Sequence, residues 1–460
     1  MESGTKEGGL SAVAHDTQSL TEGSISRQIF RFSVPLMLSN ILQVLFNMAD
    51  IATVGRFVGA HALGSVGSTA TLVTLFTGFL IGMGGGVNVM VARYFGAKHE
   101  GDVRETVHTA LLLCLIAGVA LLACGVAFSR GMLELLNTKE ELIEDAVLYL
   151  RVYFLGMPAM AVYNFGNAVF SAVGNTKKPL LFLTTAGVIN VALNLFFVIV
   201  CGLGVVGVAI ASAASQYVCA VLILVSLLRS KEAVALQPRA LRIHREKARF
   251  ILALGIPSGL QNAIFAIANL FIQTGVNSFD AIVVEGNSAA ANADALVYDV
   301  MAAFYMACSS FMGQNLGARK KERVLRSYFV SLAYSFGAGA ILGLLLVFFG
   351  DTFLKLFTDD PAVAAAGMDR LRIMGFSYAI SAFMDNTIAA SRGLGKSLVP
   401  TIIVILGSCV FRVAWVYTVF AYFHTIRSLY LLYAFSWSIT SVAEIVYFIR
   451  SYRQCARAMS

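Results

Sequence analysis

Residues 110–128 form the apolar run ALLLCLIAGVALLACGVAF, in which none of the nineteen side chains is charged. A helix needs about 20 such residues to cross the hydrocarbon core of a bilayer, and soluble cores rarely use runs this long. Similar runs recur along the chain, which is 58% hydrophobic and only 13% charged. A soluble domain is nearer a quarter charged. The sequence therefore predicts an all-α integral membrane protein.

Hydropathy divides the chain into about twelve membrane spans. We place them at residues 28–54, 66–92, 106–129, 146–171, 180–201, 207–228, 250–277, 290–315, 328–350, 363–391, 398–421 and 429–449. Of the 34 Lys and Arg residues, 24 fall on the side of the N-terminus and eight on the other side. Because cytoplasmic loops hold the basic excess, we expect both termini in the cytoplasm and the chain in the cell (inner) membrane. The net charge of +8 is then explained without nucleic acid.

The two halves of the chain repeat one another. Three positions recur at a constant shift of 222 residues, where Pro257, Asn262 and Asn269 match Pro35, Asn40 and Asn47. The motif GAK at 96–98 recurs as GAR at 317–319, and GNTKKP at 174–179 recurs as GKSLVP at 395–400, both shifted by 221. Each half has an even number of spans, so we expect a pseudo-two-fold axis along the membrane normal, as is common in transporters.

The repeat predicts two six-helix lobes joined by a basic loop. We expect an N-lobe at 27–228, a cytoplasmic linker at 229–249 and a C-lobe at 250–450. The polar, Gly- and Ser-rich residues 1–26 are expected to form a disordered cytoplasmic tail. Residues 451–460 are expected to form a basic cytoplasmic tail.

The first span carries polar groups on one stripe of an apolar helix. Four residues follow the spacing i, i+3, i+7 and i+10, namely Asn40, Gln43, Asn47 and Asp50. This spacing places them within an arc of about 80°. The stripe either bonds a neighbouring helix or lines a cavity. The second interpretation is favoured because an ionisable side chain within a membrane span is costly and usually functional.

The chain resembles the multidrug and toxic compound extrusion (MATE) transporters over about residues 25–450. The resemblance rests on PLMLSNILQVLFNMADIATVGR in the first span, VARYFGAKHEGD after the second, SAVGNTKKP before the fifth and the matching stations of the second half. It implies two six-helix lobes that form a V around a central cleft. It also implies antiport of a drug or metabolite outward against H⁺ or Na⁺, with no enzymatic reaction and no cofactor besides the coupling ion.

Asp50 is the first candidate for ion coupling. The family's coupling Asp lies in a D-x-x-x-V-G pattern of the first helix, matched here by Asp50, Val54 and Gly55. A carboxylate in a low-dielectric site can load and release a proton near neutral pH, and it can equally ligate Na⁺ with nearby oxygens. The alternative is a helix-end Asp that is exposed beside Arg56.

The other members of the predicted N-lobe cation site are amides and a hydroxyl. Asn190 and Asn194 lie at i and i+4 and share one helix face. Many family members have Asp at the second position, so Asn194 removes one carboxylate but leaves a carbonyl that suits Na⁺. Ser212 stands where many members have a hydroxyl. We predict that Asn47, Asp50, Asn190, Asn194 and Ser212 converge, the alternative being ordinary interhelical hydrogen bonds.

The second half offers a weaker set of candidates. The span 250–277 lacks the Glu that one branch of the family uses there. Asp385 resembles a cation-coupling position of that branch, although counting from the RG dipeptide places Ser381 in that register. Arg412 lies near mid-membrane and needs a partner, with Asp385 the first choice and Glu444 the second. Paired with Arg412, Asp385 would be structural rather than coupling.

Cleft walls in this family are usually apolar and aromatic with a few polar groups. The predicted substrate contacts are Asn40, Gln43, Phe46, Tyr163, Asn262, Phe265, Asn269, Gln273, Tyr298, Tyr305 and Arg412, with Tyr378 as a further ring. The rings suit flat cations, and ordinary packing explains them equally well. Asp294 and Asp299 either attract a cationic substrate, cap their helix or face water. We therefore expect small organic cations and membrane lipids as partners, and a monomer.

Three other functions find little support in the residues. GMGGGVNVMVARYFG lacks the G-K-[ST] ending of a phosphate loop, and the sequence contains no ATP-binding domain. The six histidines form no H-x-x-x-H or H-x-x-E-H site for a metalloenzyme. The nearest alternative is a lipid-linked oligosaccharide flippase or metabolite exporter of the same superfamily. Flippase clefts tend to be strongly cationic, whereas Arg412 is the only central basic residue expected here.

Overall fold

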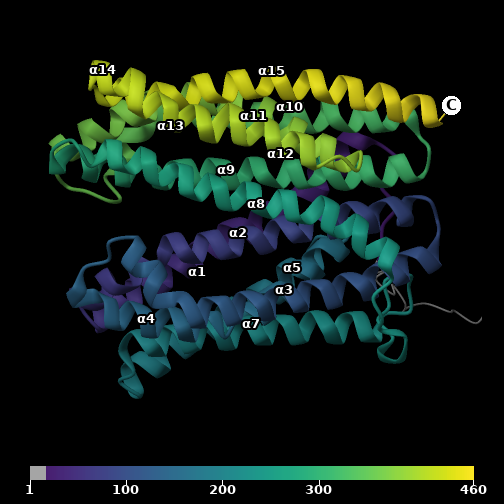
Figure 1. Cartoon of the computed structure of the whole chain (residues 1–460), viewed down its shortest axis with the longest axis horizontal. Helices are drawn as coiled ribbons and strands as arrows, with labels where there is room; N and C mark the ends of the chain where they lie inside the picture. The colour runs from purple at the N-terminus through teal and green to yellow at the C-terminus, as the bar shows by residue number, and fades with distance from the viewer. Residues whose placement is uncertain (1–16, 460) are drawn as a thin grey trace, which may run out of the picture.

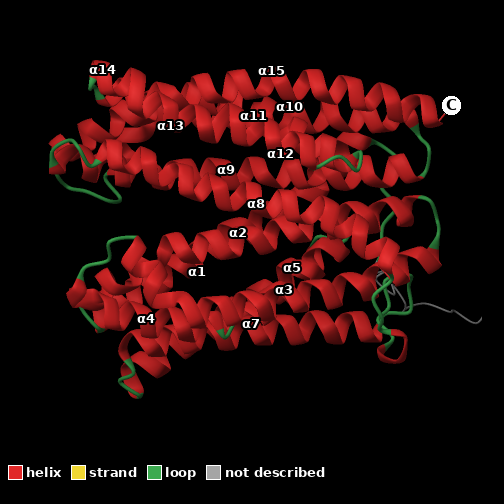
Figure 2. Ribbon diagram, in the orientation of Figure 1, coloured by secondary structure: helices red, strands yellow, loops and turns green. Residues whose placement is uncertain are grey.

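The computed structural model describes residues 17–459, and every regular element within them is a helix (Figure 2). The first half comprises α1 (Ile25–Phe57), α2 (Ala60–Gly96), α3 (Glu100–Leu135), α4 (Glu140–Phe154), α5 (Met157–Ala172), α6 (Lys177–Leu195), η1 (Phe196–Val200) and α7 (Gly204–Arg229). After the short turn η2 (Pro238–Ala240), the second half comprises α8 (Arg245–Val276), α9 (Ala281–Gly317), α10 (Lys321–Leu354), α11 (Pro361–Gly393), α12 (Leu398–Val404), η3 (Ile405–Val410), α13 (Phe411–Trp415), η4 (Val416–Phe420), α14 (Ala421–Phe423) and α15 (Ile426–Met459).

Length and apolar character agree with a multi-pass membrane protein. Ten helices of the described chain are long and apolar enough to cross a bilayer, and α4 and α5, bent by 47° at the break between them, meet the same test when taken together as an eleventh. The segments from α12 to α14 count as one of the ten, over Leu398–Phe423. The predicted span at 363–391 corresponds to α11, which is as long as the others but carries five charged residues. The predicted fold class, an all-α membrane protein with two six-helix lobes, is confirmed.

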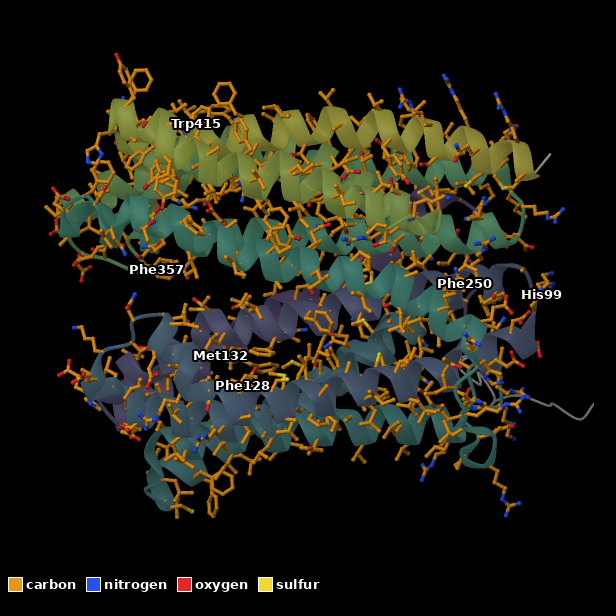
Figure 3. The ribbon with its side chains drawn as sticks, viewed as in Figure 1. His99, Phe128, Met132, Phe250, Phe357 and Trp415 are labelled. Carbon is orange, nitrogen blue, oxygen red and sulfur yellow. The ribbon has the colours of Figure 1, made fainter. Side chains whose placement is uncertain are left out.

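The helices form two groups that meet along α2. Figure 1 shows α8–α15 above α1–α7, with α2 and α8 side by side between them. We call the end of the bundle that holds Gly96, Gly317 and the C-terminus the base, which is at the right in Figure 1. The opposite end, at the left, is the top. Figure 3 shows His99 toward the base and Trp415 toward the top. The two halves are therefore long parallel stacks with a shared seam.

Glycines bring α2 into backbone contact with the second half. A Cβ at Gly86 would meet the backbone of Gly255, and one at Gly96 would meet the backbone of Gln314. Small residues allow such close approach between membrane helices. The seam is therefore tightest from the middle of α2 to the base.

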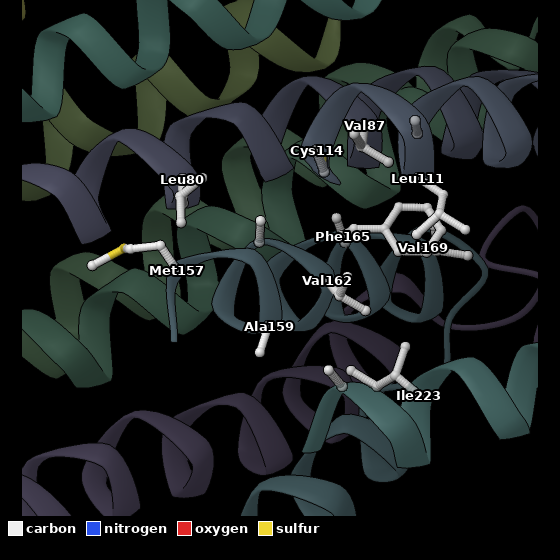
Figure 4. Close-up of a cluster of buried hydrophobic side chains, with 14 of the residues drawn as sticks. Leu80, Val87, Leu111, Cys114, Met157, Ala159, Val162, Phe165, Val169 and Ile223 are labelled. Carbon is white, nitrogen blue, oxygen red and sulfur yellow. The ribbon is translucent and has the colours of Figure 1, made fainter. Parts of the chain in front are cut away.

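The main apolar core of the first half lies among α2, α3, α5 and α7. Figure 4 shows Leu80, Cys114, Phe165 and Ile223, one from each of these helices, and all four are buried. Cys114 behaves here as a small apolar residue. This core fixes α7 against α5. It therefore sets the position of the polar residues in the part of α7 that lies nearer the top.

The chain ends differ from the predicted tails. Leu20, only 2% exposed, packs among α1 and α9, and its backbone N–H donates to Gln314 Oε1 at 2.9 Å. The prediction of a disordered segment to residue 26 is thus wrong for residues 17–26, because the apolar side chain of Leu20 is buried against the helices. Residues 1–16 lie outside the described residues. At the other end α15 continues to Met459, so the basic residues 451–459 form helix rather than a separate tail.

Candidate functional site

The carboxylate of Asp50 lies in the last third of α1, near the top, and accepts hydrogen bonds from two other helices. Asn194 of α6 donates its Nδ2 to one carboxylate oxygen, and Ser212 of α7 donates its Oγ to the other at 2.9 Å. Asn190 donates its Nδ2 to Ser212 Oγ at 3.4 Å, and its Oδ1 accepts from Asn194 Nδ2 at 3.2 Å. These four side chains, which we call the Asp50 cluster, form one closed network.

Burial makes the Asp50 cluster an unusual place for a charge. Asn190, Asn194 and Ser212 are at most 5% exposed, while Asp50 is half-buried. The Oδ1 atom of Asn194 is buried and accepts no hydrogen bond from any described residue. Buried polar atoms are normally bonded, so a free carbonyl beside a carboxylate is a ready partner for a small cation. With one carboxylate, three amide or hydroxyl groups and no sulfur or imidazole, the cluster suits H⁺ or Na⁺.

The helix that supplies both asparagines changes its winding directly after them. The α-helical part of α6 ends at Leu195, and η1 continues as a π-helix. Such π-helical turns are rare and often accompany functional sites, because they shift the register of the residues that follow. The second half has a similar turn, η4, close to the matching place in the repeat.

The polar stripe of α1 was predicted either to bond a neighbouring helix or to line a cavity, and its residues differ in this respect. Asn40 donates to the backbone oxygen of Asp299 in α9 at 2.9 Å, and Gln43 donates to Tyr163 Oη at 3.4 Å. Asn47 is exposed and takes part in none of the hydrogen bonds of the Asp50 cluster. The structure thus brings together four of the five residues predicted to converge and leaves Asn47 outside.

The predicted ion pair of Arg412 is wrong in this structure. Its guanidinium lies over the rings of Tyr433 at 4.8 Å and Phe265 at 5.3 Å, and its Nε donates to Ser436 Oγ at 3.2 Å. Neither Asp385 nor Glu444 forms an ion pair with it in the described chain. Aromatic faces attract cations in dry surroundings, so a buried guanidinium can be held without a carboxylate.

A second buried arginine was missed from the sequence. Arg370 donates to Asp294 through Nε and Nη2 and to Asn287 Oδ1 at 2.7 Å, and Tyr378 Oη also donates to Asp294. The α11 helix begins at Pro361 after the N-cap Asp360, which places Arg370 about two and a half turns inside the helix. The Asp360–Pro361 pair is a helix-start signal that locates it. Asp294 and Tyr378 are therefore committed to this network rather than free for substrate.

The remaining predicted cleft residues fall into three groups: side chains that are hydrogen-bonded, rings that are packed against other helices or buried, and side chains that are exposed. Asn262 donates to the backbone oxygen of Gly78 across the seam at 2.9 Å, and Gln273 donates to Asn277 at 2.8 Å. The ring of Phe46 packs on Gly187 of α6, and Tyr305 is buried. Asn269 and Tyr298 are exposed.

Comparisons with known proteins agree with the repeat. The sequence profile of the MatE family matches residues 35–196 and 257–418, which together cover more than half of the chain. The second match begins 222 residues after the first, which is the shift at which Pro35, Asn40 and Asn47 recur in the second half.

Relatives of this chain include transporters named for different substrates. The "probable multidrug resistance protein YpnP" of Bacillus subtilis is 29% identical over 78% of this chain and 80% of its own length. The "FAD transporter" of Shewanella oneidensis is 26% identical over 76% of this chain and 78% of its own length. The solved structure of a MOP superfamily transporter from Pyrococcus furiosus superposes with a TM-score of 0.88 at 22% identity, covering 95% of this chain and 98% of that chain.

Proposed function

Because this chain belongs to the MatE family of membrane transporters, we propose that it is a secondary active antiporter. It exports organic, mostly cationic compounds in exchange for H⁺ or Na⁺ by alternating access. The observation that supports this proposal most directly is the Asp50 carboxylate, which is held by side chains of two other helices. A multidrug resistance protein among the relatives supports the substrate class.

The Asp50 cluster has the chemistry to convert ion binding into helix movement. A charged Asp50 accepts hydrogen bonds at both oxygens, which ties α1 to α6 and α7. Neutralisation by a proton weakens these charge-assisted bonds, and Na⁺ replaces them with metal–oxygen contacts. In either case the bonds between α1 and its neighbours change, which allows α1 to shift relative to them. Pro35 lies inside α1 and gives the helix a point at which to bend.

Orientation follows from the distribution of charge. The base carries the basic linker and the basic end of α15, so we place the base and both chain ends in the cytoplasm, in the cell (inner) membrane. The top, with Asp50, then faces outward. Ions that enter down their gradient reach the Asp50 cluster from the outside. The predicted lobe boundaries at 27–228 and 250–450, and a monomeric state, are part of this proposal.

Export of a metabolite is the second candidate. The FAD transporter among the relatives moves a large anionic compound, and the second half of this chain contains the half-buried Arg392 and the buried Arg412. Arg370 does not add to this positive charge, because Asp294 neutralises it. Two basic residues fall short of the strongly cationic cleft expected of a lipid-linked oligosaccharide flippase.

A cell assay tests the proposal. Bacteria that lack their main efflux pumps are loaded with a fluorescent organic cation, and retention is followed with and without the protein. We expect lower retention with the wild type, full retention with Asp50→Asn at equal expression, and wild-type behaviour for Asp351→Asn, an exposed acid near the top of α10. If the wild-type protein left retention of the dye unchanged and FAD accumulated in the medium, the second candidate would be favoured.

A further inference from the structure

A basic pocket lies at the base of the first half, at the opposite end of the bundle from the Asp50 cluster. It lies between the first turns of α3 and the segment 230–244 that joins α7 to α8, which we call the linker. Its volume of about 430 Å³ is typical of a small-molecule site. Its walls carry three arginines and two histidines, namely Arg104, His108, Arg239, Arg242 and His244.

Hydrogen bonds hold the linker on α3 and so fix the walls of this pocket. The backbone N–H of Gln237 donates to His108 Nε2 at 3.0 Å, and the backbone N–H of His244 donates to Thr109 Oγ1 at 3.0 Å. His108 is buried. The pocket is therefore built from two segments of the chain that are bonded to one another.

The pocket has an excess of positive charge. Its three arginines are charged at any physiological pH, while Glu105 is the one acid in its walls within the described chain. Asp102, one turn before this acid, is neutralised by an ion pair with Lys247 at the start of α8. Three cations against one acid favour an anionic ligand.

One of the arginines lacks an acceptor in the protein. The Nε atom of Arg104 is buried and has no hydrogen-bond partner among the described residues. Buried polar atoms are normally bonded, so this donor points to a ligand. Arg239 is exposed, and Arg242 donates its Nε to His244 Nε2 at 2.9 Å. Guanidinium groups match the spacing of phosphate oxygens, so a phosphate group suits these donors.

Apolar side chains lie beside the arginines. Leu241 lines the pocket, and Leu241, Ile243 and Phe250 are all exposed. Figure 3 shows Phe250 toward the base, as it does His99. A soluble phosphate compound gains little from exposed apolar side chains, whereas a phospholipid carries acyl chains next to its phosphate. Basic and apolar residues together are typical of a segment at the boundary between headgroups and acyl chains.

We propose that this pocket binds the phosphate headgroup of an anionic phospholipid of the cytoplasmic leaflet. The three arginines contact the phosphate, and the acyl chains lie beside the exposed apolar side chains. The choice of leaflet rests on the orientation in the proposed function, whereas the site itself goes beyond that function. Because α3 belongs to the first half and the linker leads into α8, a bound lipid joins the two halves at the base.

Lipid binding to the purified full-length protein tests this site. Native mass spectrometry counts bound phosphatidylglycerol, with phosphatidylcholine as a lipid without net charge and glycerol phosphate as a phosphate without acyl chains. We expect one phosphatidylglycerol to bind more tightly than either of the others. The double variant Arg239→Gln/Arg242→Gln changes two exposed residues and should bind it roughly 25-fold more weakly, about fivefold for each basic residue. Arg453→Gln/Arg457→Gln removes the same charge from exposed positions of α15 at the base and should leave binding unchanged.

Three results would overturn the site. The first is equal affinity of the double variant and its control for phosphatidylglycerol. The second is equally tight binding of phosphatidylcholine, which would show that no anion is recognised. The third is equally tight binding of glycerol phosphate, which would assign the pocket to a soluble phosphate compound. Export is not measured in this experiment, so a protein that binds the lipid but exports no compound would contradict the proposed function alone.

Discussion

Asp50 and Asn194 lie 144 residues apart in the sequence, and the Asn194 amide donates directly to the Asp50 carboxylate. The bond joins the last third of α1 to the end of α6, where the helix changes to the π-helical turn η1. Ser212 closes the arrangement from α7. Three helices of one half therefore depend on the ionisation of a single side chain, which is the arrangement expected of a coupling site.

Replacing the amide by an acid should change how the site handles protons. In Asn194→Asp, two carboxyl groups face one another, and they cannot both be charged at this distance, so they share a proton. We expect efflux that depends more strongly on a pH gradient and less on a Na⁺ gradient than in the wild type. The measurement is efflux from proteoliposomes under each gradient. Asn292→Asp, which adds an acid at an exposed position of α9, is the control.

The seam between the halves should tolerate a methyl group at one glycine and not at its neighbour. A Cβ at Gly86 would meet the backbone of Gly255, whereas one at Gly85 meets nothing within 4 Å. We expect Gly86→Ala to lower stability by about 1–3 kcal/mol through overpacking, and Gly85→Ala to leave it unchanged. Thermal unfolding in detergent measures both. Equal melting temperatures for the two variants would show that α2 and α8 are not in contact here.

The buried ion pair of Arg370 and Asp294 should contribute far more to stability than an exposed ion pair. Asp294→Asn leaves the Arg370 guanidinium buried without its counter-charge, which costs about 3–5 kcal/mol. Asp369→Asn breaks the exposed pair with Arg427 and costs about 0–1 kcal/mol. We expect low expression and a low melting temperature for the first variant alone. A stable Asp294→Asn protein that has lost efflux would instead assign Asp294 to transport.

Leu20 should anchor the segment that precedes α1. Its side chain is buried with Phe304 and Phe311, so Leu20→Ala should cost about 2–5 kcal/mol. Glu22→Ala, an exposed neighbour, should have little effect. Hydrogen exchange at the base is the more direct measurement, with faster exchange near Gln314 expected in the first variant. Identical exchange in both variants would mean that the segment does not pack there in solution.

The fold was accessible from the sequence because its signals are local or repeated. Apolar runs locate the helices, and the constant shift between Asn40 and Asn262 reveals the duplication. The relation of Asn190 to Asn194 also follows from helical spacing alone. What remained out of reach was the rotation of each helix against its neighbours, which tertiary packing decides.

Arg412 and Leu20 show where this missing rotation matters. Sequence reasoning sought a carboxylate for Arg412, but the rotation of α15 presents Tyr433 and Ser436 to it. Leu20 stands in a polar segment whose composition is typical of disorder, and only the three-dimensional structure provides a buried site for it. In the same way Asn47 lies on the predicted stripe, yet it is exposed and takes part in none of the hydrogen bonds of the Asp50 cluster.

Gradient-driven efflux from proteoliposomes tests the central claim most directly. A fluorescent organic cation is loaded, and a proton or a sodium gradient is imposed separately, for the wild type, Asp50→Asn and the control Asp351→Asn. We predict efflux in the wild type and the control under at least one gradient, and none above the protein-free rate in Asp50→Asn. Efflux that survives unchanged in Asp50→Asn would contradict ion coupling at Asp50 and move it to the second half.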